Sequence, residues 1–287
     1  MAKSILPNHR MTKKGLNGFL HMEEDKEEGP EQIVPGVARA LSPLVRRILA
    51  LNPSPQRSYG TNTYLIGIDE IVVIDPGPEN SVHFDSVIGC GGDRIKWVTS
   101  TCSDPEHAGA IDALIERTGA RRLTPQDGDT ILGTEFRITI HDMDGPVTDH
   151  KSFLLEEERT LICGKLISDD QSIPLISGSS NLSAYHQSFQ KTQKMRLKRF
   201  APAFGHVIED PKKAVSSAIQ SFDKTDQDIL KALKKGARTP TEIATASASK
   251  GSNTEDIESL AESVQVHLTK LAEEKSVKHL KAGWAIR

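Results

Sequence analysis

Residues 60–78 have the sequence GTNTYLIGIDEIVVIDPGP, in which two apolar runs flank a short polar turn. Runs rich in Ile, Val, Thr and Tyr favour extended structure, so we predict strands at Thr63–Ile68 and Ile71–Asp75. Asp69-Glu70 forms the turn between them, and Pro76-Gly77-Pro78 stops the second strand. This segment therefore predicts a strand pair that ends at the carboxylate of Asp75.

Short strands and helices continue on both sides of this segment, as judged from the spacing of apolar residues. Strands come first, then alternating strands and helices, then a meander, then a helix, a strand and a helix. This order predicts two sheets packed face to face with helices outside, an α+β fold. The predicted strands are at 45–51, 95–99, around 123, 131–132, 136–140, 153–155, 161–163 and 199–203, and the helices at 81–88, 106–118 and 183–196.

Beyond Asp210-Pro211, a favourable helix start, the chain is mainly helical. We predict helices at Asp226–Lys235, from Thr239, and at Asn253–Glu274, followed by a hairpin at Val277–Ile286. Three helices and a hairpin are typical of a winged helix. Its charges nearly balance, so we interpret it as a docking or dimerisation module, with nucleic-acid binding as the alternative.

Bulk composition fits one large and one small domain in 287 residues. The net charge of −3 argues against a surface that coats nucleic acid generally. Three widely spaced cysteines suit a reducing compartment, so we expect a cytoplasmic protein. No apolar run approaches the roughly 20 residues that cross a bilayer, so we expect no membrane association. Residues 1–32, acidic around 22–30, predict a polar N-terminal extension.

Several segments together resemble the lactamase-β-like-2 group of the metallo-β-lactamase superfamily, over roughly residues 33–287. The resemblance implies a four-layer αββα metallo-β-lactamase sandwich at 33–222 and a C-terminal winged-helix domain at 223–287. The segments that carry it are Asn52-Pro53-Ser54-Pro55, Gly60–Leu65, Val73–Pro78, Ser152–Glu158 and Ile208–Pro211.

The resemblance also implies a metal site, because members of this group usually hold two metal ions that activate a bridging water. Their first ligand motif, HxHxDH, corresponds to Cys102, Asp104, Glu106 and His107. Only the last of its histidines is retained. Cys, Asp and His side chains all occur in zinc sites, so these four residues remain candidate metal ligands.

The later ligand positions of the group are altered more severely. Its second histidine corresponds to Pro146, its bridging aspartate to Lys165 and its final histidine to Phe204. His206 lies two residues further on, and His141 and His150 flank Pro146 out of register. We therefore expect that the dinuclear site is largely lost and that no cofactor is bound. The alternative is one zinc held by Asp104, His107 and either Cys102 or His206.

Lys165 is the most informative of these changes. A dication and an ammonium repel by about 8 kcal/mol at a separation of about 4 Å and an effective dielectric constant of about 20. Our hypothesis is that Lys165 replaces the lost cation and pairs with Asp104 and Glu106. The alternative is that Lys165 points into solvent.

The positions that correspond to the metal site of the group form what we call the former-site pocket. Three further residues in or near it allow more than one interpretation. Cys102 is a nucleophile only if a base lies within hydrogen-bond reach and its pKa is lowered. His107 is a candidate metal ligand or base, and the alternative is that it caps its helix or bonds a backbone carbonyl. Asp75 resembles a carboxylate behind the metal ligands of the group, and here either orders its turn or accepts a hydrogen bond from Lys165.

A group of basic residues lies near the end of the 183–196 helix. Positive charge at a helix C-terminus is favourable, which explains the group without any ligand. The alternative is a contact with RNA or phosphate, because the resembled group includes single-strand-specific ribonucleases. The residues are Lys191, Lys194, Arg196, Lys198 and Arg199.

Our first functional expectation is a non-catalytic or catalytically altered homologue that binds a small molecule or a protein partner. The first alternative is a hydrolase of esters, thioesters or RNA phosphodiesters that uses a reduced, one-metal site. The second is an RNA-binding module that uses the winged helix and the basic group. A homo-oligomer is compatible with each.

Overall fold

The computed structural model describes residues 33–53, 60–169, 173–248 and 252–287. The predicted extension at 1–32 lies outside the described residues, as do Ser54 and Pro55 of the Asn-Pro-Ser-Pro segment.

The first sheet is mixed. The pairs β1–β2, β2–β3 and β3–β4 are antiparallel, whereas β4–β5 and β5–β6 are parallel. Its order is β1-β2-β3-β4-β5-β6, with bounds Arg39–Ala40, Val45–Leu49, Asn62–Ile66, Ile71–Ile74, Ile95–Thr99 and Arg121–Arg122.

The second sheet is mostly antiparallel, and only β11 runs parallel to its neighbour β10. Its order is β11-β10-β9-β8-β7. In chain order the bounds of β7 to β11 are Thr130–Leu132, Arg137–Asp142, Lys151–Leu155, Thr160–Gly164 and Arg199–Pro202.

Alternation along β4 explains how the layers pack. Successive side chains of a strand point to opposite faces, so Val72 and Ile74 join the core between the two sheets. Ile71 and Val73 instead pack outward, in the core that α1 (Ser81–Gly91) and α3 (Ile111–Thr118) complete. All four residues of the strand are buried, as expected when both faces of a sheet are covered.

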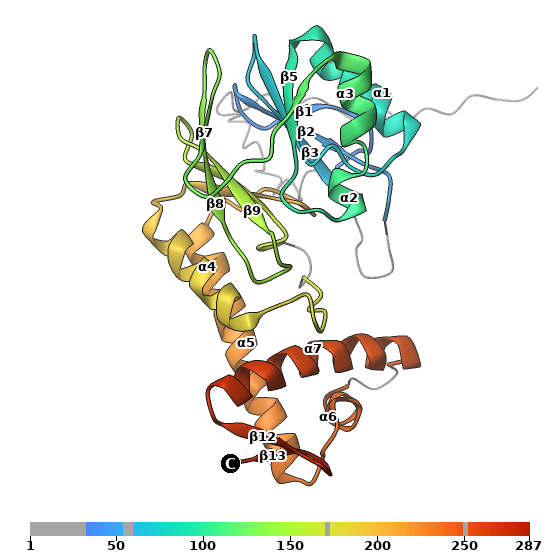
Figure 1. The fold of residues 1–287 in the computed structure, drawn as a ribbon, viewed down its shortest axis with the longest axis vertical. Coiled ribbons are helices and arrows are strands. Elements are labelled where there is room, and N and C mark those ends of the chain that lie inside the picture. Colours follow the sequence, from blue (N-terminus) through green and yellow to red (C-terminus); the bar gives the residue numbers. More distant parts are fainter. Residues whose placement is uncertain (1–32, 54–59, 170–172, 249–251) are drawn as a thin grey trace, which may run out of the picture. The chain divides into compact units, whose positions relative to one another are not determined.

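The outer face of the second sheet is covered by α4 (Leu182–Lys194) and the first half of α5 (Pro211–Lys234). Tyr185 and Phe189 of α4 belong to the same buried cluster as Phe200 of β11. Figure 1 shows α1 and α3 outside the first sheet and α4 beside the second. The order of layers is therefore helix, sheet, sheet, helix, as predicted.

The predicted helix at 106–118 is wrong in one respect, because the chain forms α2 (Pro105–Ala108) and then α3. The break has a backbone cause at the turn after β4. The N–H of Gly77 donates to the carbonyl of His107 at 3.1 Å, and the N–H of Ala110 donates to the carbonyl of Gly77 at 3.0 Å. These two bonds divert backbone groups from the helix and tie α2 to the end of β4.

The C-terminal part contains the second half of α5, then α6 (Pro240–Ser247), α7 (Thr254–Glu273) and the antiparallel pair β12 (Val277–Leu280) and β13 (Gly283–Ile286). The predicted order of three helices and a hairpin is present, while its assignment to the winged-helix class and the boundary at 222/223 stay predictions. The predicted helix at 226–235 is the second half of α5, which runs on without a break because residues 212–235 contain neither Gly nor Pro.

None of the helices in the described part of the chain has both the length and the apolar character needed to cross a bilayer.

Candidate functional site

Asp75 lies at the carboxyl end of β4, fully buried and with a φ of 53°. Because β4 and β5 are parallel neighbours, the residues that follow β5 lie beside it. The backbone N–H of Thr101 donates to Oδ1 of Asp75 at 2.6 Å, and the Thr101 hydroxyl donates to Oδ2 at 2.8 Å. A positive φ is costly for a residue other than glycine, and these bonds hold Asp75 in that conformation.

His107, from α2, completes the bonding of Asp75, with 2.9 Å between His107 Nδ1 and Asp75 Oδ2. Burial alone would lower the pKa of His107, but the charge and hydrogen bond of Asp75 outweigh it, and the net effect raises that pKa. The ring also meets Phe204 edge-on, with 5.8 Å between the ring centroids. His107 therefore bonds a carboxylate, and not a helix end or a backbone carbonyl as expected. The expected hydrogen bond from Lys165 to Asp75 is not formed, because the partners of Asp75 are His107 and Thr101.

Nε2 of His107 is buried and has no hydrogen-bond partner among the described residues. Its neighbour Glu106 places Oε1 3.6 Å away, beyond hydrogen-bond distance. The Asp75 bond fixes the imidazole so that this nitrogen faces Glu106.

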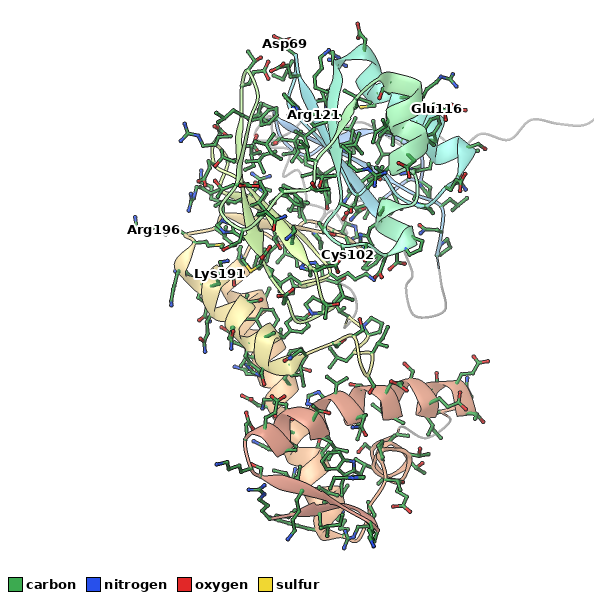
Figure 2. The ribbon with its side chains drawn as sticks, viewed as in Figure 1. Asp69, Cys102, Glu116, Arg121, Lys191 and Arg196 are labelled. Atoms are coloured by element: carbon green, nitrogen blue, oxygen red, sulfur yellow. The ribbon has the colours of Figure 1, made fainter. Side chains whose placement is uncertain are left out.

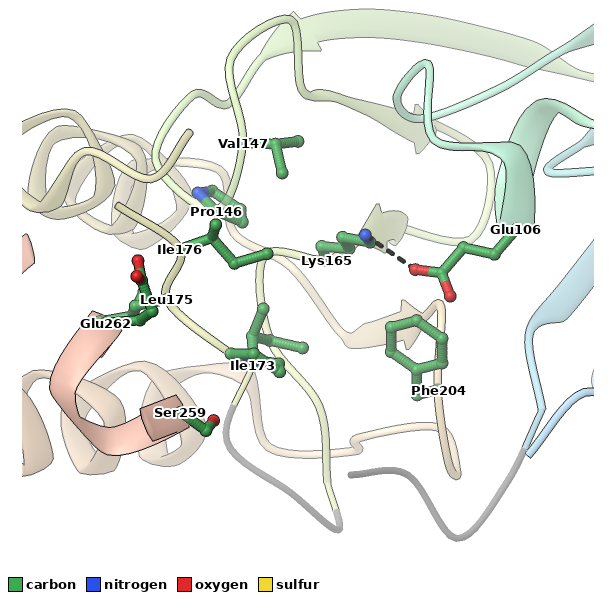
Figure 3. A pocket seen from close by; sticks show the side chains of 11 residues that line it. Glu106, Pro146, Val147, Lys165, Ile173, Leu175, Ile176, Phe204, Ser259 and Glu262 are labelled. Atoms are coloured by element: carbon green, nitrogen blue, oxygen red, sulfur yellow. Dashed lines mark ion pairs between the residues drawn. The ribbon is translucent and has the colours of Figure 1, made fainter. Parts of the chain in front are cut away.

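The ammonium of Lys165 lies between two carboxylates. Its Nζ contacts Oδ2 of Asp104 and lies 2.8 Å from Oε1 of Glu106. Burial lowers the pKa of Lys165, but its hydrogen bonds to Asp104 and Glu106 outweigh this and raise it. Figure 3 shows Lys165 and Glu106 pointing toward each other above Phe204. The predicted ion pairs are present, and the alternative that Lys165 points into solvent is wrong.

His150 anchors the main chain of Lys165, a role that its sequence position out of register did not suggest. Its Nε2 accepts from the backbone N–H of Lys165 at 3.0 Å, and its Nδ1 lies 3.0 Å from the Met143 carbonyl. Burial lowers the pKa of His150 to about 3, so the ring is neutral and donates through Nδ1. The only sequence signal was its place directly before a strand.

Gly164 makes this approach of Lys165 to His150 geometrically feasible. It has a φ of 53°, and a Cβ there would lie 2.6 Å from Nε2 of His150 and 2.6 Å from the hydroxyl of Thr101. The bend at Gly164 therefore requires glycine both for its conformation and for space.

Together these contacts form a row of alternating charge, which we call the charge row: Asp75, His107, Glu106, Lys165 and Asp104. It runs from the buried end of β4 to Asp104, whose side chain is 38% exposed. With three carboxylates, one ammonium and His107 either neutral or protonated, its net charge is −2 or −1.

Cys102 lies close by but is a poor nucleophile. Its side chain is buried, and burial is the main cause that raises the pKa of its thiol to about 12. A thiol in this state is protonated at neutral pH. The described residues contain no group of three or more His, Cys, Asp or Glu side chains placed to hold a metal ion.

A pocket of about 310 Å³ opens beside the charge row (Figure 3). Lys165, Glu106 and Phe204 line one side, and α7 supplies Ser259 and Glu262 on the other. The remaining lining is apolar and comprises Pro146, Val147, Ile173, Pro174, Leu175 and Ile176. A larger cavity of about 560 Å³ between α4 and α5 shares Ile173 but does not reach the charge row.

His206 does not line this pocket. Its backbone N–H donates to Oδ1 of Asp169 at 2.8 Å, and its Nδ1 lies 3.0 Å from Oδ2 of the same carboxylate. The structure thus brings together Cys102, Asp104, Glu106 and His107 with Asp75, Pro146, Lys165 and Phe204, whereas His206 contacts Asp169 and does not line the pocket.

The predicted basic group is not one uniform surface. Lys191, on α4, pairs with Asp127 at 2.9 Å, and the guanidinium of Arg199, in β11, donates to the Leu41 carbonyl at 3.4 Å. Lys194, Arg196 and Lys198 are exposed. Figure 2 shows Arg196 pointing outward near the end of α4.

The chain is similar to known proteins over most of its length, although no protein-family profile matches it. It is 27% identical over 217 residues to a beta-lactamase-like protein 2 homolog from Caenorhabditis elegans, covering 68% of this chain and 72% of that protein. It is 28% identical over 212 residues to an atrochrysone carboxyl ACP thioesterase from Aspergillus fumigatus, covering 68% and 66% of the two proteins. A crystal structure of a metallo-beta-lactamase family protein from Thermus thermophilus superposes with a TM-score of 0.70 at 17% identity, covering 86% of this chain and all of that one.

Proposed function

We propose that this chain, which has the metallo-β-lactamase fold, is a non-catalytic or catalytically altered homologue that binds a small ligand in the pocket beside Lys165. The observation that carries the proposal is the position of the Lys165 ammonium between Asp104 and Glu106. In this proposal the ammonium supplies, within the chain itself, the positive charge that metal ions supply in other proteins of this fold.

The residues present do not fit a dinuclear metal centre. Lys165 occupies the two carboxylates of the first motif, and a dication about 4 Å from its ammonium would be repelled by about 8 kcal/mol at an effective dielectric constant of about 20. Pro146 has no donor atom in its side chain, and the ring of Phe204 packs on His107. The donors that remain are Cys102, Asp104, Glu106 and His107.

A second candidate function is a hydrolase of esters or thioesters that uses one metal ion, and two observations favour it. The Nε2 atom of His107 is buried, oriented by Asp75 and without a hydrogen-bond partner among the described residues. In addition, one of the similar proteins is named as a thioesterase. A metal would polarise the scissile bond and activate water. Such a site requires Lys165 to leave Asp104 and Glu106.

RNA binding is the third candidate and has weaker support. Lys194, Arg196 and Lys198 are exposed, but Lys191 is paired with Asp127 and the charge row is negative. We also propose a cytoplasmic location, which the three free thiols at Cys90, Cys102 and Cys163 support.

Metal analysis by mass spectrometry tests the proposal directly. Purified protein is dialysed against zinc and then against buffer, and its zinc is compared with that of Lys165→Ala and Lys151→Ala. Lys151 pairs with Asp142 outside the pocket and serves as the matched control. We expect far less than one zinc per chain for the unaltered protein and for Lys151→Ala, and a marked gain for Lys165→Ala. About one tightly held zinc or iron per unaltered chain, with thioesterase activity that a chelator abolishes, would establish the hydrolase instead.

A further inference from the structure

We propose that the pocket beside Lys165 selects a small apolar amine, bound as its ammonium form, and discriminates against anions. This inference rests on the proposed function, because it concerns the pocket as it is when Lys165, and no metal ion, supplies the positive charge.

The described side chains around the pocket carry a net negative charge. Lys165 is the only cationic side chain among the described residues that line it, and its ammonium already contacts Asp104 and Glu106. The charge row is negative whether or not His107 is protonated. Glu262, on the opposite side, adds a further negative charge. The combined charge of the row and Glu262 is therefore −2 or −3.

Because a charged ligand loses water when it enters the pocket, this negative charge makes the pocket favour cations over anions. An anion that enters an apolar pocket loses water and is stable there only if a cation or several hydrogen-bond donors replace it. Here the one ammonium is shared between two carboxylates. An ammonium ligand instead meets the carboxylate of Glu262, on the side of the pocket opposite the Lys165 ammonium (Figure 3). Two metal dications in the same place would reverse this preference, so the loss of the metal centre also reverses the charge of the favoured ligand.

The apolar side chains that line the pocket favour an apolar body in the uncharged part of the ligand. Val147, Ile173, Leu175 and Ile176 present aliphatic side chains, and Phe204 presents an aromatic ring. Ile176 is 52% exposed, which leaves apolar surface for a ligand to cover. A volume of about 310 Å³ is at the small end for ligand pockets, which fits a compact aliphatic or aromatic body.

Glu262 is the residue to test, because its charge can be removed with little change in shape. Its Oε2 accepts from the backbone N–H of Ser177 at 3.0 Å, a bond that the amide oxygen of glutamine can also accept. Glu273 is a matched control on the same helix. Its Oε2 accepts from the hydroxyl of Ser183 at 2.7 Å, and it does not line this pocket.

The experiment is a calorimetric titration of the full chain with phenylbutylamine, phenylbutanol and phenylbutyrate, which share one apolar body and differ in charge. We expect phenylbutylamine to bind about tenfold more tightly than phenylbutyrate, with the alcohol between them. Glu262→Gln should reduce this ratio about threefold or more, and Glu273→Gln should leave it unchanged. Ile176→Lys, which adds a cation to the lining, should shift the preference toward phenylbutyrate.

Phenylbutyrate binding as tightly as the amine would overturn the inference, and so would the absence of binding by all three probes. Equal effects of Glu262→Gln and Glu273→Gln would do the same. The zinc measurement separates the two proposals. A zinc-free protein that prefers the anion defeats only the inference, whereas a zinc-loaded protein defeats the proposed function.

Discussion

The backbone N–H of Lys165 donates a hydrogen bond to Nε2 of His150 at 3.0 Å. The lysine that balances Asp104 and Glu106 through its side chain is thus fixed through its main chain to a neutral, buried imidazole. Protonation of that imidazole would remove the acceptor, so the position of Lys165 depends on His150 staying neutral.

Stability should therefore fall as the pH drops below neutrality. The pKa of His150 is lowered to about 3 and that of His83 to about 4, in both cases mainly by burial. Below the ordinary value of about 6.5 the unfolded chain binds protons that the folded chain does not, so each histidine costs up to about 1.4 kcal/mol per pH unit until its folded pKa is reached. Urea unfolding between about pH 7 and pH 5 measures the slope.

Single substitutions show which histidines cause this dependence of stability on pH. His83→Gln should make the acid limb shallower, whereas His279→Gln, on the exposed face of β12, should leave it unchanged. A stability that is flat or rises toward acid pH would contradict the neutral state of both buried rings.

Above neutral pH, the pair of Asp75 and His107 should make the stability fall as the pH rises. The pKa of His107 is raised, so its contribution is complete below about 6.5 and is lost as the pH rises through the folded value. Asp75→Asn keeps a residue type that tolerates the positive φ but removes the charge. We expect this variant to be less stable near neutrality and to lack the alkaline loss, as measured by thermal unfolding across pH. An unchanged alkaline limb would place the effect elsewhere.

Gly164→Ala should be strongly destabilising. The new Cβ would lie 2.6 Å from both the His150 ring and the Thr101 hydroxyl, at a φ of 53°. Gly119 is the control, because its φ is 69° and a Cβ there meets nothing within 4 Å. We expect about 1 kcal/mol for Gly119→Ala from backbone strain alone and about 3 kcal/mol or more for Gly164→Ala. Equal losses in denaturant unfolding would show that the contact with His150 carries no energy.

Loss of the Lys165 ammonium should cost stability out of proportion to its single charge. Lys165→Ala leaves Asp104 and Glu106 facing each other without a cation, and we expect a loss of about 2 kcal/mol. Lys151→Ala breaks a more exposed pair with Asp142 and should cost less than about 1 kcal/mol. Added zinc should raise the melting temperature of Lys165→Ala more than that of the unaltered chain.

The three thiols should differ in reactivity. Cys102 and Cys163 are buried, and burial raises the pKa of each, to about 12 for Cys102, whereas Cys90 is partly exposed. Brief treatment of the folded protein with iodoacetamide should modify Cys90 first, as read by peptide mass spectrometry. Rapid modification of Cys102 would reopen its interpretation as a nucleophile.

Much of the fold was predictable because local patterns determine it. The apolar run at Ile71–Ile74 and the Pro-Gly-Pro after it predict a strand and its end from local sequence alone. The break between α2 and α3 was not predictable, since it depends on backbone bonds to Gly77, far earlier in the chain. The continuity of α5 was not predicted, although residues 212–235 contain neither Gly nor Pro.

The site was predictable where charge decides the contact. The pairing of Lys165 with Asp104 and Glu106 follows from opposite charges placed on adjoining loops. The partners of Asp75 were not predictable, because they depend on the parallel register of β4 and β5, which brings Thr101 beside it. His150 was missed for a similar reason, since its partner is a backbone N–H that carries no sequence signature.

Helix α5 has a consequence for how this protein tolerates length changes. Val215 packs in the cluster on the second sheet, and eleven residues later Asp226 contacts His267 and Lys270 of α7, the helix that brings Glu262 to the pocket. One residue inserted between these points would rotate everything after it by about 100° and advance it by about 1.5 Å. Insertions and deletions inside α5 should therefore damage ligand recognition far more than substitutions at the same positions, because the helix sets the phase between the two halves of the chain.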